Sequence, residues 1–188
     1  MSVVRVFAVL LLSGLLTACV AVAPGSKPAA ADFDILGRVL INGEGRAFSS
    51  GLRWRHDATG DELWLMSPVG QTLAHIVADT AGAVLTTPDL LEYRERSVEN
   101  LTRRALGWPL PLGGLRHWIQ AVPIPGENPV VSNRDGSGRL QLLEQDGWSI
   151  RYSYPDAPGA VLPRRIDLNR SGQQIRLVID SWRNAEAP

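Results

Sequence analysis

The feature that most constrains the fold is a period-two alternation of apolar and polar residues, which runs through most of the chain from Phe33 onward. In the segment 149–154, for example, Ile150, Tyr152 and Tyr154 fall on one face and polar residues on the other. The same pattern gives common faces to Phe48, Leu52, Trp54 and His56, and to Ile175, Leu177 and Ile179. Such alternation is typical of antiparallel strands with one covered face and one solvated face.

Turn sequences divide this pattern into short strands. They recur at residues 42–45, 59–61, 79–82, 135–138 and 146–147. Sequences such as Asn-Gly and Asp-Gly favour tight hairpins because glycine and asparagine accept positive φ angles. About ten short strands result, which predicts a meandering antiparallel sheet.

Two short helical segments interrupt the meander once. Ser97 is a suitable N-cap and Gly107 a suitable C-terminal residue for a first helix. A second helix is expected over about 113–121, because Leu115 and Trp118 then share one face. Strands followed by helices and then by more strands predict an α+β fold, in which helices cover one face of a single curved antiparallel sheet.

The N-terminal segment is expected to direct export and lipidation. Arg5 precedes an apolar run over 6–16, which has the length of a signal peptide and is too short to cross a bilayer. The sequence Leu-Thr-Ala-Cys19 that follows resembles a bacterial lipobox, in which the cysteine is acylated after cleavage. Cys19 is the only cysteine and so has no disulfide partner within the chain. The alternative is an ordinary signal peptide with a chance cysteine.

These signals divide the chain into three parts. We expect a signal peptide over 1–18, a lipidated flexible tether over 19–32 that is rich in Ala, Pro, Gly and Ser, and one folded domain over 33–184. Val20 follows the cysteine, whereas an aspartate there would favour retention in the inner membrane. The domain is therefore expected to face the periplasm from a lipid anchor in the outer membrane.

Charge and motif content exclude several functional classes. Basic and acidic side chains balance at 19 each, which leaves no surplus for nucleic-acid binding. The sequence has no Gly-rich phosphate loop or cofactor fingerprint, and His56, His75 and His117 lack metal-site spacing. Asp57, beside His56, is interpreted as a strand-end residue, because no Gly-x-Ser-x-Gly nucleophile turn exists. We therefore expect neither an enzyme nor a cofactor.

At short motifs spread through the folded part, the chain resembles the LolB family of outer-membrane lipoprotein receptors. The order and spacing of the motifs are those of the family: Gly37-Arg38, Trp54, Ser67-Pro68-Val69-Gly70, Leu106-Gly107-Trp108-Pro109-Leu110-Pro111, Leu115-Arg116-His117-Trp118-Ile119, Gly147-Trp148, Leu162-Pro163, Gln174-Ile175-Arg176-Leu177 and Asp180-Ser181-Trp182.

The resemblance implies an unclosed antiparallel β-barrel of about 10–11 strands, with a helical lid over an apolar cavity. It implies a monomeric receptor that accepts acylated lipoproteins from a LolA-type periplasmic carrier. The receptor would insert them into outer-membrane phospholipid without nucleotide.

The resemblance also assigns a membrane-insertion loop to Pro68, Val69 and Gly70, because Val69 takes the place of an exposed leucine on the family's protruding loop. Two departures bear on this assignment. Valine is smaller than leucine, which predicts a weaker or shared insertion role. The segment before the first strand is also too short for the family's N-terminal helix.

Apolar residues of the strands and helices are the candidates for an acyl-chain cavity. The expected lining comprises Leu52, Trp54, Leu63, Leu65, Leu73, Leu101, Trp118, Ile119, Trp148, Ile150, Leu177 and Trp182. Trp64 and Trp108 are interpreted as structural. Two plainer interpretations stay open: that each tryptophan only packs in the core, and that residues 68–70 form only a hairpin turn.

The hydrophobic effect explains why this function needs a cavity. Each buried CH₂ is worth about 0.8 kcal/mol, so three long acyl chains resist entering water by roughly tens of kcal/mol. Transfer can proceed downhill if affinity rises from carrier to receptor to membrane. The alternatives are a lipidated lipid carrier or envelope sensor of the same fold, a structural scaffold, and a hydrolase whose nucleophile or metal is not evident.

Overall fold

A computed structural model describes residues 32–43, 45–126, 130–131 and 133–183. Its strands are β1 (Phe33–Gly43), β2 (Arg46–Asp57), β3 (Gly60–Met66), β4 (Thr72–Ala78), β5 (Ala83–Thr86), β6 (Glu92–Glu95), β7 (Val130–Val131), β8 (Leu142–Gln145), β9 (Trp148–Ser153), β10 (Arg165–Arg170) and β11 (Gln173–Arg183). Two helices, α2 (Val98–Leu106) and α3 (Leu112–Trp118), follow β6. The predicted signal peptide, Cys19 and most of the tether lie outside the described residues.

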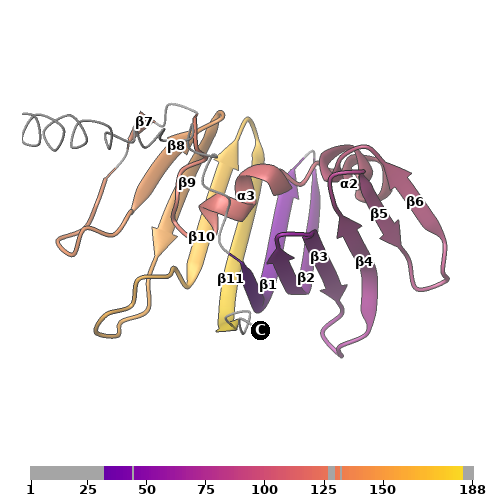
Figure 1. The fold of residues 1–188 in the computed structure, drawn as a ribbon, viewed down its shortest axis with the longest axis horizontal. Helices are drawn as coiled ribbons and strands as arrows, with labels where there is room; N and C mark the ends of the chain where they lie inside the picture. The colour runs from indigo at the N-terminus through magenta and orange to yellow at the C-terminus, as the bar shows by residue number, and fades with distance from the viewer. Residues whose placement is uncertain (1–31, 44, 127–129, 132, 184–188) are drawn as a thin grey trace, which may run out of the picture.

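All eleven strands form one antiparallel sheet. Their order is β6-β5-β4-β3-β2-β1-β11-β10-β9-β8-β7, so nearly every neighbour in space is also a neighbour in sequence, and β1 joins the two halves by pairing with β11 (Figure 1). Within the described residues β6 and β7 each have one neighbour, so the sheet does not close on itself. The predicted α+β fold with an unclosed antiparallel barrel is confirmed.

A β-bulge lies where β1 pairs with β11, at the junction of the two halves of the sheet. The pairing of β1 with β11 shifts register between Leu36 and Gly37. A Cβ atom on Gly37 would lie 2.2 Å from the carbonyl oxygen of Val178, so no larger residue fits at this crossing. Bulges increase local strand twist, and this one lies within the β1–β11 pair, which joins the two halves of the sheet.

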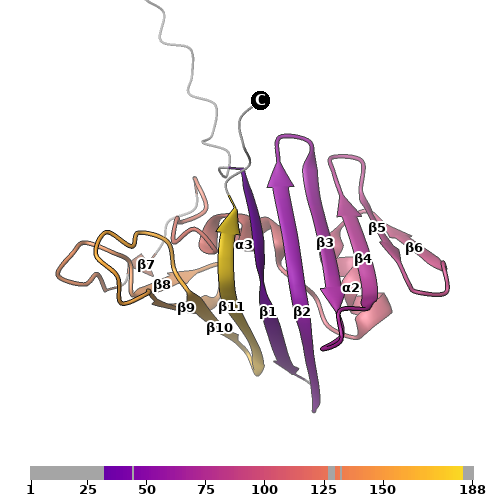
Figure 2. The same ribbon diagram turned by 90° about the horizontal axis from the view of Figure 1, so that it is seen from below.

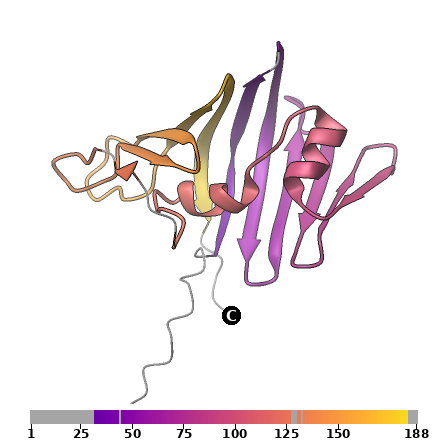
Figure 3. The same cartoon turned by 90° about the horizontal axis from the view of Figure 1, so that it is seen from above.

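The two helices lie over the same face of the sheet (Figure 3). Ser97 caps α2 by accepting a hydrogen bond from the Asn100 N–H at 3.3 Å, and Gly107 ends the helix with φ of 87°. The first predicted helix is therefore confirmed at both ends. The second ends three residues before its expected end, and Ala121 adopts a positive φ of 56°. None of the described helices is long and apolar enough to cross a membrane.

One prediction about the inner face is wrong. Leu73 does not face the interior but is 40% exposed, while its neighbours Ala74 and Ile76 are buried. The pairing of β3 with β4 shifts register here: Leu65 lies opposite Ala74, and Met66 lies opposite Thr72. Leu73 is the extra residue of this bulge and lies on the outer face with Val77, which is 43% exposed. Because β4 has apolar residues on both faces, alternation alone does not decide which face is buried.

Candidate functional site

The inner face of the sheet and the two helices enclose an apolar space that is nearly filled by side chains. Its volume is about 20 Å³, which is room for about one water molecule and not for an acyl chain. The lining residues are Val39, Ile41, Leu52, Trp54, Leu63, Leu65, Ile76, Trp108, Leu110, Leu115 and Leu177. The predicted location of the cavity, between sheet and helices, is thus apolar, but the space there is too small for an acyl chain.

The structure separates the residues expected to line this space into groups. Leu52, Trp54, Leu63, Leu65 and Leu177 line it directly. A second group, which is buried in the same core but outside the space, comprises Leu101, Trp118, Ile119, Trp148 and Ile150. Trp182 is only partly buried: its ring lies 6.1 Å from that of Phe33, and its Nε1 donates to the Pro163 carbonyl oxygen at 3.2 Å.

Sequence reasoning missed Trp108, which lies in the α2–α3 linker and borders the apolar space. Its ring lies 5.6 Å from that of Phe48. The linker is fixed beside it, because the Leu110 N–H donates to the Thr102 hydroxyl at 2.9 Å and Gln173 Nε2 donates to the Pro109 carbonyl at 3.0 Å. The local sequence gave no signal for this role, since it arises from contacts with strands β2 and β11.

Trp108 also borders a second space, a solvent-open groove of about 590 Å³. The groove runs between the linker and the β10–β11 turn and is bordered by Trp148 and by two arginines, Arg103 and Arg170. Trp108 is therefore the residue that the linings of the open groove and the apolar space have in common.

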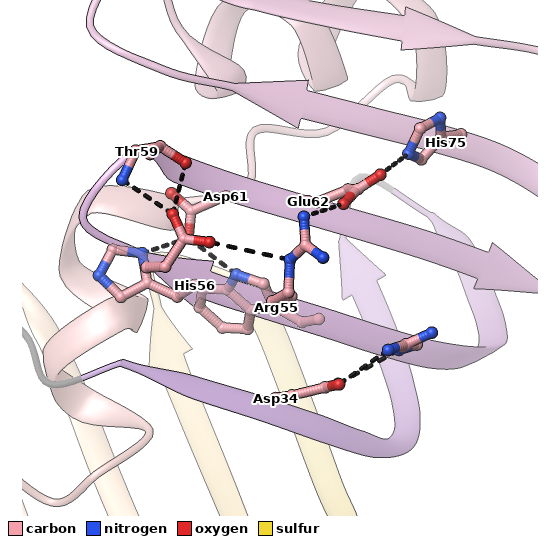
Figure 4. Close-up of polar contacts among 10 residues, drawn as sticks. Asp34, Arg55, His56, Thr59, Asp61, Glu62 and His75 are labelled. Atoms are coloured by element: carbon pink, nitrogen blue, oxygen red, sulfur yellow. Dashed lines mark hydrogen bonds and ion pairs between the residues drawn. The ribbon is translucent and has the colours of Figure 1, made fainter. Parts of the chain in front are cut away.

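A buried carboxylate attaches α3 to the β2–β3 hairpin. Asp61 Oδ1 accepts a hydrogen bond from Trp54 Nε1 at 2.8 Å and lies 3.0 Å from His56 Nδ1 (Figure 4). Its Oδ2 lies 2.5 Å from Arg116 Nη2. The Asp61 side chain is fully buried, and that of Arg116 is 32% exposed. Buried charges require such partners, so the ion pair ties the helix to the sheet.

A buried carboxamide makes the second attachment of α3. Gln145, on β8, accepts hydrogen bonds from Trp118 Nε1 at 3.0 Å and from the Ile124 N–H at 2.8 Å. Its Nε2 donates back to the Ile124 carbonyl oxygen at 3.1 Å. The end of α3 and the segment after it are thus held to the other half of the sheet by neutral hydrogen bonds.

The α3 helix depends on these attachments because its own sequence is a poor helix former. It has seven residues, two of them Gly113 and Gly114, and Pro111 at its start makes no side-chain cap. Short helices with glycine are unstable in isolation. Gly114 is required all the same, since a Cβ atom there would lie 2.4 Å from the Trp118 ring. The position of α3 over the apolar space therefore depends on tertiary contacts and not on the helix propensity of its own sequence.

The residues 67–71 form a protruding turn between β3 and β4, which we call the Val69 loop. The N–H of Gly70 donates to the Ser67 carbonyl at 2.9 Å, and Gly70 has a φ of 82°. At its base, the Ser50 hydroxyl accepts from the Met66 N–H at 2.9 Å. The Val69 side chain is 80% exposed at the tip. A fixed turn thus holds an apolar side chain in solvent.

Other polar residues of this region have structural partners. Asp57 caps the β2–β3 turn: it accepts from the Thr59 N–H at 2.8 Å, and the hydrogen bonds from Thr59 lower the pKa of its carboxyl. His75 Nε2 lies 2.9 Å from Glu62 Oε1 (Figure 4). Burial lowers the pKa of His117, with smaller contributions from His56 and Arg116. Among the described residues, no three His, Cys, Asp or Glu side chains gather as a metal site.

Comparison with known proteins connects these features with a family. A family model described as "Outer membrane lipoprotein LolB" matches residues 31–182. The outer-membrane lipoprotein LolB of Nitrosomonas europaea is 37% identical over 153 residues, which cover 80% of this chain and 72% of that protein. The LolB of Thiobacillus denitrificans is 39% identical over 172 residues, with coverages of 89% and 91%. Among solved structures, a LolA superfamily protein from Nitrosomonas europaea shares the fold, with a TM-score of 0.52, 11% identity, and coverages of 86% and 90%.

Proposed function

Since the chain belongs to the LolB family of outer membrane lipoproteins, we propose that it accepts acylated lipoproteins from a LolA-type periplasmic carrier and inserts them into the outer membrane. Family membership makes it a lipoprotein localisation factor rather than an enzyme. The proposal concerns the mechanism: which part of the molecule receives the acyl chains, and which part releases them.

The observation that carries this proposal is the apolar space beneath a cover, made of a helix and linker that only tertiary contacts hold in place. The space is lined by Leu52, Trp54, Leu63, Leu65 and Leu177, and Trp108 lines both it and the open groove. Acyl chains would enter by displacing the linker and α3. Because α3 is held by tertiary contacts rather than by its own helix propensity, that displacement would have to break the Asp61–Arg116 ion pair and the hydrogen bonds of Gln145.

Release would use the Val69 loop and the predicted anchor at Cys19. An apolar side chain in water is unfavourable unless a partner covers it, and the hydrocarbon region of a membrane is a suitable partner. Val69, which is 80% exposed, would enter the bilayer surface and bring the opened cover close to lipid. Acyl chains then pass from one apolar environment to another without crossing water, so the transfer needs no nucleotide.

The test is a transfer assay with the Cys19→Ala domain, prepared without its signal peptide. A periplasmic carrier loaded with acyl-labelled lipoprotein is mixed with this domain, and liposomes are added afterwards. We expect the label to move first to the domain and then to the liposomes. Val69→Glu should preserve folding and acceptance but reduce release, because a charge at the tip opposes entry into lipid. Normal release by this variant would exclude the role of the loop.

The nearly filled interior favours a second candidate function, in which the domain only scaffolds an outer-membrane assembly. A packed core suits a scaffold, because a scaffold has no need to open. The same assay separates the two. A folded domain that neither accepts label from the carrier nor binds free lipid would support the scaffold, whereas free-lipid binding without acceptance would support a lipid carrier or sensor.

A further inference from the structure

The connection between β5 and β6, residues 87–91, repeats the hydrogen bonding of the Val69 loop. We call it the Leu90 loop. In both loops the N–H of the fourth residue, Gly70 or Leu90, donates to the carbonyl of the first residue, Ser67 or Thr87, at 2.9 Å. The N–H of the fifth residue donates to the hydroxyl of the first at 3.2 Å in both. The N–H of the first donates to the carbonyl of the fifth at 2.8 Å and 3.0 Å.

The two loops differ at the fourth position. Gly70 has a φ of 82°, and Leu90 has a φ of 63°. Glycine adopts this left-handed region readily, but for leucine it is strained, because the Cβ atom crowds the backbone. Leu90 is also 80% exposed, and the adjacent Leu91 is 54% exposed. Folding alone therefore favours a glycine at position 90, and an outlier of this kind points to function.

Antiparallel pairing places the two loops at the same end of the strands. β3, β4, β5 and β6 are consecutive antiparallel neighbours, so the β3–β4 and β5–β6 connections lie at the same end of the strands (Figure 2). We call this end of the sheet the loop edge. Their centres are two strand spacings apart, about 10 Å. Val69, Leu90 and Leu91 therefore project from neighbouring points of one edge.

We propose that the Leu90 loop is a second membrane-contact site, which enters the surface of a phospholipid bilayer beside the Val69 loop. This inference rests on the proposed function, because it requires the loop edge to face the outer membrane. Asp89 limits the depth of entry: its carboxylate accepts a hydrogen bond from the Thr87 hydroxyl and would stay at the level of the headgroups. Contact at the interface, and not deep insertion, is therefore the expected mode.

The length of chain before β1 permits this orientation. Fourteen residue steps separate Cys19 from Phe33, and fully extended they reach at most about 46–50 Å. Phe33 begins β1 at the strand end opposite the loops, and the ten residue-to-residue steps along β1 span about 33 Å. A lipid on Cys19 can therefore lie in the same bilayer that the loop edge contacts.

The test measures lipid contact in the full lipidated chain, anchored in phosphatidylethanolamine–phosphatidylglycerol vesicles. With Cys19 acylated, Leu90→Cys or Val69→Cys supplies the one free thiol for an environment-sensitive fluorophore. Val161→Cys is the matched control, because Val161 is 72% exposed in the β9–β10 connection at the opposite edge. We expect brominated lipids to quench the probes at positions 69 and 90 at least twofold more than the probe at position 161.

The outcomes distinguish this inference from the function on which it rests. Quenching at position 69 but not at 90 overturns the second contact site and leaves the proposed release step standing. Equal quenching at all three positions, or none above that at 161, overturns both.

A second variant checks the role of the Leu90 side chain without a probe. Leu90→Gly removes the apolar group and relieves the backbone strain, so the melting temperature should stay equal or rise. Release of labelled lipoprotein into the vesicles should slow at least twofold, while Val161→Gly should leave it unchanged. Unchanged release by Leu90→Gly would overturn a functional role for the contact.

Discussion

Two buried side chains hold α3 against opposite halves of the sheet, and they do so with different chemistry. Asp61 binds Arg116 through an ion pair of 2.5 Å and shares its other oxygen with Trp54 and His56. Gln145 binds Trp118 and Ile124 through neutral hydrogen bonds. Both side chains are almost fully buried, so the contrast lies in charge rather than in exposure.

This difference indicates which side of the cover resists opening. Removing one partner of a buried ion pair leaves an uncompensated charge, whereas a lost neutral hydrogen bond costs less. Trp54 both lines the apolar space and donates to Asp61, so the charged attachment lies beside that space. We therefore expect the Asp61 side to hold the cover closed and the Gln145 side to act as its hinge.

The largest expected effect comes from removing the charged attachment. Asp61→Ala should destabilise the Cys19→Ala domain by about 3–5 kcal/mol, because Trp54 Nε1, His56 and Arg116 all lose a buried partner. Urea denaturation followed by tryptophan fluorescence measures the change. Asp61→Asn is the matched control: it keeps an acceptor for Trp54 and should lose less. A loss below about 1 kcal/mol for Asp61→Ala would contradict the assigned importance of the ion pair.

The neutral attachment should have a smaller effect. Gln145→Leu keeps the volume apolar but leaves Trp118 Nε1 and the Ile124 backbone without their partner, so we expect a loss of about 1–3 kcal/mol. Gln174→Leu, which alters an exposed glutamine on β11, is the control and should be nearly neutral. If Gln145→Leu cost more than Asp61→Ala, the roles of the two sides would be reversed.

Local sequence patterns were sufficient for the strands and for α2, because each of these elements carries its signal within itself. The alternation of β9 and β11 and the caps at Ser97 and Gly107 predicted what the structure contains. The error at Leu73 arose because β4 has apolar residues on both faces, and α3 ended early because Ala121 leaves the helical region. Both the facing of Leu73 and the end of α3 depend on contacts with residues that are distant in the sequence.

The Asp61 attachment was missed although part of its signal was present. Once Ala58-Thr59 is taken as the two-residue hairpin turn, Asp57 pairs with Gly60 and His56 lies opposite Asp61. The relevant partner of His56 is then Asp61 and not its sequence neighbour Asp57. Arg116 could not be inferred, because it comes from a helix far along the chain. The volume of the apolar space was likewise beyond sequence reasoning, since it depends on how side chains such as Trp108 pack.

The smallest expected effect is a pH dependence confined to the charged side of the cover. Burial, with help from His56 and Arg116, lowers the pKa of His117 below its ordinary value of 6.5. As pH falls below about 6.5, the unfolded chain binds a proton at this position before the folded chain does, so stability decreases until the lower folded pKa is passed. Because His117 is only partly buried, the loss should stay under about 1 kcal/mol.

The His117→Gln variant should remove this part of the acid sensitivity. Melting temperatures of the wild-type and variant domains should converge at pH 8 and differ at pH 5, with the variant the more stable. His75→Gln is the control, since His75 lies against Glu62 away from α3. Combined with Gln145→Leu, His117→Gln should give the same shift as it does alone, because the two act on separate attachments. A different melting-temperature shift in the double variant would show that the two attachments of α3 open together. The distinct roles assigned to the Asp61 side and the Gln145 side would then be wrong.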